Sequence, residues 1–166
     1  MYKYLREDIK KLEPYEVKEI KHRIKLDANE GINWVDDLNR YPNDRCDELR
    51  HRLAEYLNGD SKELLIGNGS SELIEYCMKA YLEANETVVS ISPSFSMYEI
   101  YTVINKGAYE QYPLDDMKKL NTEGFIEFIK DKRAKLVILG NPNNPTGTMI
   151  PRREIHKIID SVNAMV

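Results

Sequence analysis

The chain has 166 residues, with 24 Lys and Arg against 28 Asp and Glu, for a formal net charge of −4. This length is typical of one domain. No apolar run approaches the roughly 18 residues of a membrane span, and the N-terminal MYKYLREDIK lacks the apolar core of a signal peptide. The interspersed charges provide no basic patch for nucleic acid. We therefore expect a cytoplasmic protein that contacts neither membrane nor nucleic acid.

The two cysteines, Cys46 and Cys77, give no sign of a metal centre or a disulfide framework. They lack CxxC spacing and have no pair of histidines nearby. Each falls within a helical pattern, so we expect both to be buried as small apolar side chains. The histidines are expected at the surface or in the N-terminal segment, without a catalytic role; they are His22, His51 and His156.

The chain divides into an irregular first part and a regular remainder. Residues 1–43 are polar and are expected to form an arm or a solvated face. From residue 44 onward, helical and strand patterns alternate. Helical spacing predicts helices near 44–57, 70–81, 97–104, 125–129 and 151–162, and short apolar runs predict strands at 64–66, 87–91, 109–114 and 136–139. The last of these strands is apolar throughout, as in a central strand that is covered on both faces.

Alternating strands and helices predict an α/β fold, a three-layer α/β/α sandwich with a mainly parallel sheet. Ligands of such sheets bind outside the carboxyl ends of the strands. Three segments with unusual chemistry follow predicted strands, and all three are expected at that edge; they are 67–72, 92–98 and 140–147. The site is therefore expected there.

The first segment, Gly67-Asn68-Gly69-Ser70-Ser71-Glu72, is suited to an anion. Its glycines allow a sharp turn, and the serines offer donors at a helix N-terminus, where the partial charge is positive. An ordinary capped connection between strand and helix remains the alternative. The segment lacks the Lys-Ser/Thr ending of a Walker A loop and the third glycine of the dinucleotide fingerprint, so a nucleotide is disfavoured.

The second and third segments carry an aromatic residue and a cluster of amides. Phe95 follows a strand and Pro93, where its ring either projects over a ligand or packs in the core. The third segment, Asn141-Pro142-Asn143-Asn144-Pro145-Thr146-Gly147, has a composition that a turn explains only in part. The repeated Asn-Pro step also directs side-chain amides to one place.

The chain resembles the N-terminal part of the pyridoxal-phosphate-dependent aminotransferases of fold type I, most closely the histidinol-phosphate aminotransferase branch. The resemblance rests on five strings in family order: Leu26-Asp27-Ala28-Asn29-Glu30, Asn39-Arg40-Tyr41-Pro42, Gly67 to Glu72, Pro93 to Tyr98 and Asn141 to Gly147. It implies a large-domain sheet with the strand order 3-2-4-5-6-7-1, of which this chain supplies strands 1 to 4.

The resemblance also implies how the cofactor, pyridoxal 5′-phosphate, is bound. Ser70 and Ser71 would hold its phosphate with their amides and hydroxyls. Phe95 would stack on its pyridine ring, a role that suits a flat apolar side chain. Asn144 would hydrogen-bond its phenolic oxygen.

Two residues of the first part take family roles at the borders of the site. Tyr41 resembles the tyrosine that reaches the cofactor phosphate of the neighbouring subunit, which implies a homodimer. Asn29 lies in the segment that borders the substrate, although the continuation Gly31-Ile32-Asn33-Trp34 departs from the family pattern. Without the resemblance, Tyr41-Pro42 reads as a turn and Asn29 as a cap or loop residue.

In the family the catalytic machinery lies further along the chain than Val166. The lysine that forms the Schiff base, the aspartate that holds the pyridine nitrogen and the arginine that binds the substrate carboxylate are all expected beyond it. The resemblance therefore implies residues 1–43 as an arm with substrate and dimer contacts, 44–166 as an incomplete cofactor-binding large domain, and no catalytic residue within the chain.

The function expected from the resemblance is amino-group transfer between a phosphorylated amino alcohol or amino acid, histidinol phosphate first, and 2-oxoglutarate. We expect the 166 residues alone to be inactive, because the lysine is missing. Two alternatives stay open. One is a non-catalytic module that binds a phosphorylated ligand or dimerises, and the other is part of a threonine-phosphate decarboxylase-like enzyme. No metal is expected in any of these cases.

Overall fold

The structure is a computed structural model that describes residues 2–13, 24, 26, 28–31 and 41–166. The described chain forms two compact units, one of Met1–Leu12 with Gly69–Val166 and the other of Glu13–Asn68. Much of the predicted arm lies outside the described ranges, and so do seven residues named above: His22, Asp27, Ile32, Asn33, Trp34, Asn39 and Arg40.

The unit that contains Gly69–Val166 is built on a three-stranded parallel sheet. Its strands are β1 (Thr87–Ser92), β2 (Ala108–Pro113) and β3 (Leu136–Ile138), in the order β2-β1-β3. β1, β2 and β3 are the second, third and fourth strands predicted from the sequence. Their order therefore matches the 3-2-4 part of the strand order that the resemblance implies. β3 also pairs on its other side, where Met165 donates to Lys135 O at 3.0 Å and accepts from Val137 N at 2.7 Å.

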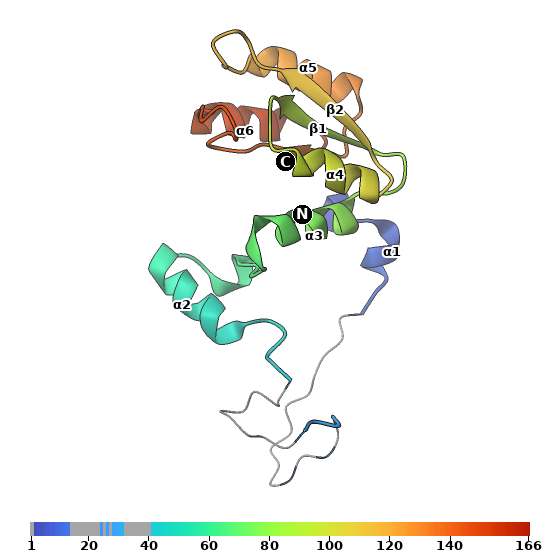
Figure 1. The fold of residues 1–166 in the computed structure, drawn as a ribbon, viewed down its shortest axis with the longest axis vertical. Coiled ribbons are helices and arrows are strands. Elements are labelled where there is room, and N and C mark those ends of the chain that lie inside the picture. Colours follow the sequence, from blue (N-terminus) through green and yellow to red (C-terminus); the bar gives the residue numbers. More distant parts are fainter. Residues whose placement is uncertain (1, 14–23, 25, 27, 32–40) are drawn as a thin grey trace. The chain divides into compact units, whose positions relative to one another are not determined.

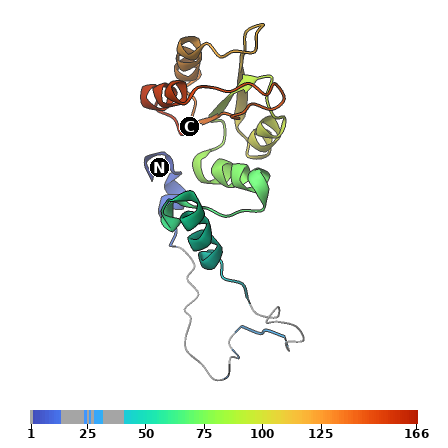
Figure 2. The same ribbon diagram turned by 90° about the vertical axis from the view of Figure 1, so that its left-hand side faces the viewer.

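Helices cover both faces of this sheet, as Figures 1 and 2 show from two directions. On one face lie α3 (Gly69–Tyr81) and α4 (Met97–Ile104), which pack against each other. On the other face lie α5 (Thr122–Asp131) and α6 (Arg152–Ser161). The predicted three-layer α/β/α arrangement is therefore confirmed in this unit.

The two apolar layers follow from the alternation of side chains along the strands. Val88 and Leu136 face α3 and α4, whereas Val89 and Val137 face α5 and α6. β1 and β3 are thus covered on both faces, as continuous apolar runs predict. The other fully buried apolar side chains divide between the layers in the same way, with Met78 and Leu82 in the first and Ile91, Phe125, Ile129 and Ile158 in the second.

The first residues of the chain belong to the same unit. A short helix, α1 (Glu7–Lys10), follows the turn Tyr2–Tyr4. Arg6 binds the end of α3, with its backbone amide donating to Ala80 O at 3.0 Å and its guanidinium donating to Lys79 O at 3.0 Å. A cation suits this place, because the last carbonyls of a helix are unpaired and carry partial negative charge.

The other unit contains α2 (Asp47–Leu57) and a short turn of 3₁₀ helix, Ser61–Glu63. Arg50 joins them through two hydrogen bonds to Ser61 O, at 3.0 and 2.5 Å. The strand predicted at 64–66 is wrong, since these residues are neither helix nor strand and Leu65 is 65% exposed. Three apolar residues form a strand only where a neighbour takes their backbone hydrogen bonds, and the described residues provide none here.

The prediction that both cysteines are buried is wrong. Cys46 is exposed and Cys77 is half-buried. Cys46 stands before the first turn of α2 with φ of 50°, so the helical pattern does not carry it inward. Partial burial raises the pKa of the Cys77 thiol above its ordinary value.

None of the helices in the described ranges combines the length and apolar character that a bilayer crossing requires. In those ranges, likewise, no group of three or more His, Cys, Asp or Glu side chains is placed to hold a metal ion.

Candidate functional site

The N-terminus of α3 has the features of an anion site. Gly69 opens the helix with φ of 81°, where glycine is favoured, and a Cβ built on it meets nothing within 4 Å. Ser70 is exposed and Ser71 is half-buried. Glu72 also lies in this first turn, and its carboxylate accepts a hydrogen bond from Tyr76, which raises the Tyr76 pKa. The amides of a first helical turn have no partners within the helix, so this end presents donors to an anion.

The chain path places this N-terminus toward the carboxyl ends of the strands. α3 leads into the amino end of β1 through residues 82–86, so helix and strand run in opposite directions. α3 has 13 residues and β1 has six. Both are therefore about 20 Å long, at roughly 1.5 and 3.3 Å per residue. The beginning of α3 thus lies toward the edge where β1 ends.

Phe95 lies in the loop that follows β1. Its half-buried ring stands edge-on to Tyr98, with the ring centroids 5.7 Å apart and the planes at 87°. Tyr98 is 8% exposed, and this burial raises its pKa. The Ser94 hydroxyl lies 3.4 Å from the hydroxyl of Tyr109, which ties the loop to β2. Phe95 is therefore anchored on one side without being covered on all sides.

The Asn-Pro segment after β3 is a closely hydrogen-bonded loop. The side chain of Asn141 pairs with Ile150, donating to its carbonyl at 3.1 Å and accepting from its amide at 2.9 Å. Asn143 pairs through its backbone with Thr148 and Gly147, at 2.8 and 2.7 Å. The loop therefore holds its shape through its own residues. Three peptide bonds in and beside the site are cis: Ser92-Pro93, Asn141-Pro142 and Asn144-Pro145.

Asn143 joins this loop to the loop of Phe95. It is only 3% exposed, and its Nδ2 donates to the Pro93 carbonyl at 2.9 Å and to Thr146 Oγ1 at 2.8 Å. The sequence motifs did not mark Asn143 as a site residue. The repeated asparagines indicated converging amides, but local sequence carries no signal for which of them points inward.

Asn144 has the opposite surroundings. It is exposed, and no hydrogen bond of its side chain appears within the described part of the chain. Its neighbours Asn141 and Asn143 use their amides to build the loop, which leaves the Asn144 amide available to a ligand. The structure thus brings the loops of two predicted residues, Phe95 and Asn144, together at the carboxyl edge of the sheet.

Tyr41 and Asn29 lie in the other compact unit, and they are described within that unit alone. Tyr41 is 72% exposed, and its backbone amide donates to Glu30 Oε1 at 2.9 Å. Asn29 is exposed and has φ of 51°. The carboxylate of Glu30 therefore brings two of the five strings of the resemblance together.

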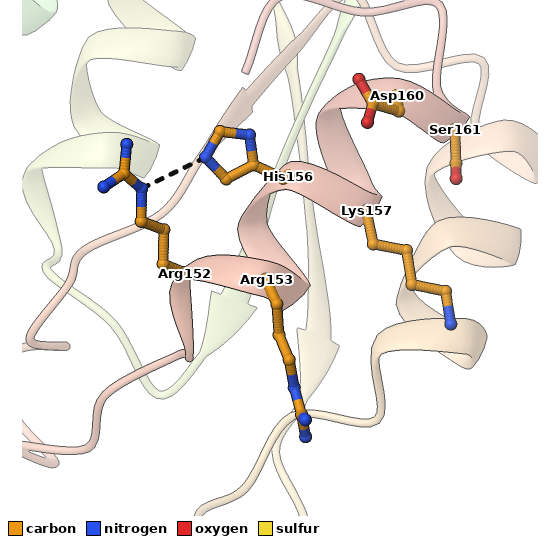
Figure 3. Close-up of a pocket in the computed structure, with 6 residues that line it drawn as sticks. All are labelled: Arg152, Arg153, His156, Lys157, Asp160 and Ser161. Carbon is orange, nitrogen blue, oxygen red and sulfur yellow. Dashed lines mark hydrogen bonds between the residues drawn. The ribbon is translucent and has the colours of Figure 1, made fainter.

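A hollow of about 630 Å³ lies elsewhere, along the outer face of α6. Figure 3 shows its six lining side chains, all of them from this one helix and its end: Arg152, Arg153, His156, Lys157, Asp160 and Ser161. The Arg152 guanidinium donates to His156 Nε2 at 3.3 Å, and Lys157 pairs with Glu123 of α5. A hollow lined by a single exposed helix encloses no ligand, so we do not assign the site to it.

The residues at the carboxyl edge fit a planar ligand that bears a phosphate. The first turn of α3 presents donors for the phosphate, Phe95 presents a partly uncovered ring, and Asn144 presents an amide without a described partner. An anion at a helix N-terminus and a flat ring against an aromatic side chain are both favourable contacts.

Comparisons with known proteins identify the family of this chain. The family model described as "Aminotransferase class I and II" matches residues 11–166. A curated histidinol-phosphate aminotransferase of Clostridium novyi (strain NT) is 39% identical over 175 residues, which cover 97% of this chain and 49% of that protein. The chain thus spans about half the length of the curated relatives it matches.

Two solved structures are similar in fold. The histidinol-phosphate aminotransferase of Sinorhizobium meliloti in complex with pyridoxal-5′-phosphate superposes with a TM-score of 0.69 at 23% identity, covering 74% of this chain and 33% of that one. A decarboxylase from Sulfurospirillum multivorans has a TM-score of 0.61 at 27% identity, covering 69% and 32%. The matched family model, which extends over most of the 166 residues, shows that the chain belongs to the class I and II aminotransferases.

Proposed function

We propose that this chain forms the cofactor-holding part of a pyridoxal-phosphate-dependent aminotransferase that transfers the amino group of histidinol phosphate to 2-oxoglutarate. The name shared by the most similar curated relatives supports this substrate. A phosphorylated amino alcohol or amino acid is the corresponding substrate class. The enzyme is expected to act in the cytoplasm as a homodimer.

One observation carries the proposal. The amide of Asn143 donates to the Pro93 carbonyl at 2.9 Å, and this bond joins the loop of Phe95 to the loop of Asn144. A stacking ring and an amide for a phenolic oxygen are needed at one place for the cofactor to be held by its ring. The first turn of α3 adds the donors for its phosphate.

Each of these residues has a distinct part in the proposed site. Ser70 and Ser71 bind the phosphate with their amides and hydroxyls. The ring of Phe95 supports one face of the pyridine ring, and the amide of Asn144 donates to the phenolic oxygen. When bound, pyridoxal phosphate supplies the electron sink that stabilises negative charge at the substrate α-carbon.

The proposal also covers the N-terminal arm and the catalytic lysine. We infer an arm of residues 1–43 and a cofactor-binding segment of 44–166, with Tyr41 directed to the cofactor phosphate of a partner subunit and Asn29 to the substrate. No lysine of the chain follows the serine-rich motif of the family. The 166 residues alone are therefore expected to hold the cofactor without catalysing transfer.

Binding of pyridoxamine 5′-phosphate tests the proposed site. This amine form of the cofactor has no aldehyde and does not react with surface lysines, so it reports the non-covalent site alone. We expect saturable binding to the 166-residue chain by ³¹P NMR titration. Ser71→Ala removes one hydroxyl donor to the phosphate and weakens binding by about tenfold, the value of one hydrogen bond to a charged group.

Ser161→Ala is the matched control, because Ser161 lies at the end of α6, outside the proposed site. The control variant is expected to bind like the wild type. Absence of saturable binding by the wild-type chain, or equal weakening by both substitutions, would contradict the proposed site.

The similarity to the Sulfurospirillum multivorans decarboxylase supports a second candidate, a decarboxylase that acts on a phosphorylated amino acid. Both candidates use the same cofactor site. A substrate panel on the full-length enzyme separates them, because only the decarboxylase releases carbon dioxide without consuming 2-oxoglutarate.

A further inference from the structure

We propose that Asn143 is a positioning residue that sets Phe95 and Asn144 in register for the cofactor ring. This inference rests on the proposed function, and it adds a residue that neither the sequence motifs nor the comparisons assign. Asn143 does not itself reach a ligand, since it is 3% exposed. It acts through the two loops that it connects.

One hydrogen bond of Asn143 joins segments that are 50 residues apart in sequence. Its Nδ2 donates to the Pro93 carbonyl, two residues before Phe95, at 2.9 Å. Its backbone belongs to the same loop as Asn144, the next residue in the chain. A single buried side chain thus connects the stacking residue to the amide that meets the phenolic oxygen.

The geometry requires an amide rather than a carboxylate. The NH₂ group of an asparagine has two protons, and here both are used, for Pro93 O and for Thr146 Oγ1 at 2.8 Å. The Oδ1 atom of Asn143 is buried and has no partner among the described residues. The side chain is therefore held by its donors, which an aspartate of the same shape does not possess.

A second contact closes the connection on the other side. A Cβ built on Gly140 lies 3.2 Å from the Tyr98 hydroxyl and 3.6 Å from Asn143 Oδ1. Tyr98 in turn meets Phe95 edge-on. The Tyr98 hydroxyl and the Asn143 carboxamide therefore both lie close to Gly140, where a side chain would crowd the Tyr98 hydroxyl.

Hydrogen–deuterium exchange of the 166-residue chain tests this coupling without any ligand. Asn143→Asp keeps the shape of the side chain and removes both donors. We expect exchange to rise about tenfold in the amides of residues 94–98 as well as in those of 143–148. The matched control is Asn141→Asp, the same substitution in the same loop, which removes only a bond to Ile150. In the control, faster exchange is expected within 141–150 alone.

Faster exchange confined to residues 143–148 in Asn143→Asp overturns the inference, as does equal acceleration of 94–98 by the control. Peptides from α5 report whether the variant remains folded. If the α5 peptides also lose protection, Asn143→Ser, which is smaller and neutral, is compared with Asn141→Ser. The exchange of residues 94–98 in these two variants then tests the inference in the same way.

A binding measurement distinguishes the positioning of the cofactor ring from a general loss of order in the site. We expect Asn143→Asp to weaken pyridoxamine 5′-phosphate by about tenfold while leaving inorganic phosphate, which needs only the first turn of α3, unchanged in ³¹P NMR titrations. Equal weakening of both ligands contradicts a positioning role. If the wild type binds neither ligand, the proposed function fails, and the exchange experiment still decides whether Asn143 couples the loops.

Discussion

At the scale of single residues, the three asparagines of the 141–147 loop have different surroundings. Asn141 closes the loop on Ile150, Asn143 reaches across to Pro93, and Asn144 is exposed. The sequence places the same side chain at all three positions, and only position 144 was assigned to a ligand. Loops that are held by a rigid scaffold often carry binding residues, so the exposed Asn144 amide is well placed to meet a ligand.

Substitution by alanine distinguishes a structural asparagine from a ligand-binding one. Asn141→Ala is expected to lower the free energy of unfolding by about 1–2 kcal/mol, because it removes two hydrogen bonds. Asn144→Ala is expected to change it by less than about 0.5 kcal/mol, as for an exposed side chain. Urea denaturation of both variants measures the difference, and a loss at Asn144 as large as that at Asn141 would show a structural role instead.

At the scale of elements, periodicity predicted the helices and strands more accurately than it predicted their faces. The helix at 69–81 is present, but its most buried residue is Met78, which is fully buried between the helix and the sheet. Helical spacing predicts Leu73, Ile74, Cys77 and Tyr81 on the apolar face. Of these, Tyr81 is buried, whereas the other three are half-buried. The buried stripe depends on where β1 and β3 lie, and local sequence does not contain that information.

Two methionines test this packing by the same substitution. Met78→Ala leaves a cavity against Val88 and Leu136, and a loss of about 2–5 kcal/mol in the free energy of unfolding is expected. Met117→Ala is the matched control, because Met117 is 67% exposed, and a change below about 0.5 kcal/mol is expected. Equal effects in urea denaturation would mean that Met78 is not in the core.

The short helix α4 shows why a face was assigned wrongly. Six of its eight residues are apolar or aromatic, so its periodicity favours no side strongly. Helical spacing predicts Met97, Tyr101 and Ile104 on the inward face. The buried residues are instead Tyr98 and Thr102, and Tyr101 is half-buried against the layer of Val88 and Leu136. Ile104 is 63% exposed. A helix that is apolar all round takes its orientation from its neighbours.

At the scale of the whole molecule, the 166-residue chain leaves apolar surface uncovered. Ile100, Val103 and Ile104 lie one turn or less apart on α4 and are 44%, 62% and 63% exposed. A contiguous apolar stripe on a soluble protein is typical of a surface that contacts another segment or molecule.

This stripe predicts that the isolated chain binds a hydrophobic dye such as anilinonaphthalene sulfonate. The double variant Val103→Gln with Ile104→Gln is expected to reduce dye fluorescence by about half, because it removes most of the contiguous patch. Ile159→Gln is the control, an exposed isoleucine on α6 at 46% exposure. Dye binding that the double variant leaves unchanged would locate the apolar surface elsewhere.

The sequence by itself determined the alternation of elements from residue 69 onward, the α/β class and the two loops that follow β1 and β3. These features depend on local periodicity, on turn residues and on motifs that are contiguous in the chain. The strand expected at 64–66 failed for the same reason, since a local pattern does not report whether a neighbouring strand is present.

Only the tertiary structure decided which side chains connect segments that are distant in sequence. Asn143 reaches Pro93 across 50 residues of sequence, Gly140 makes room for the Tyr98 hydroxyl, and Cys46 is exposed instead of buried. Burial and hydrogen bonding of this kind depend on the path of the chain between distant segments. The residue types were readable in advance, but the contact that brings Phe95 and Asn144 to one place exists only once the sheet has formed.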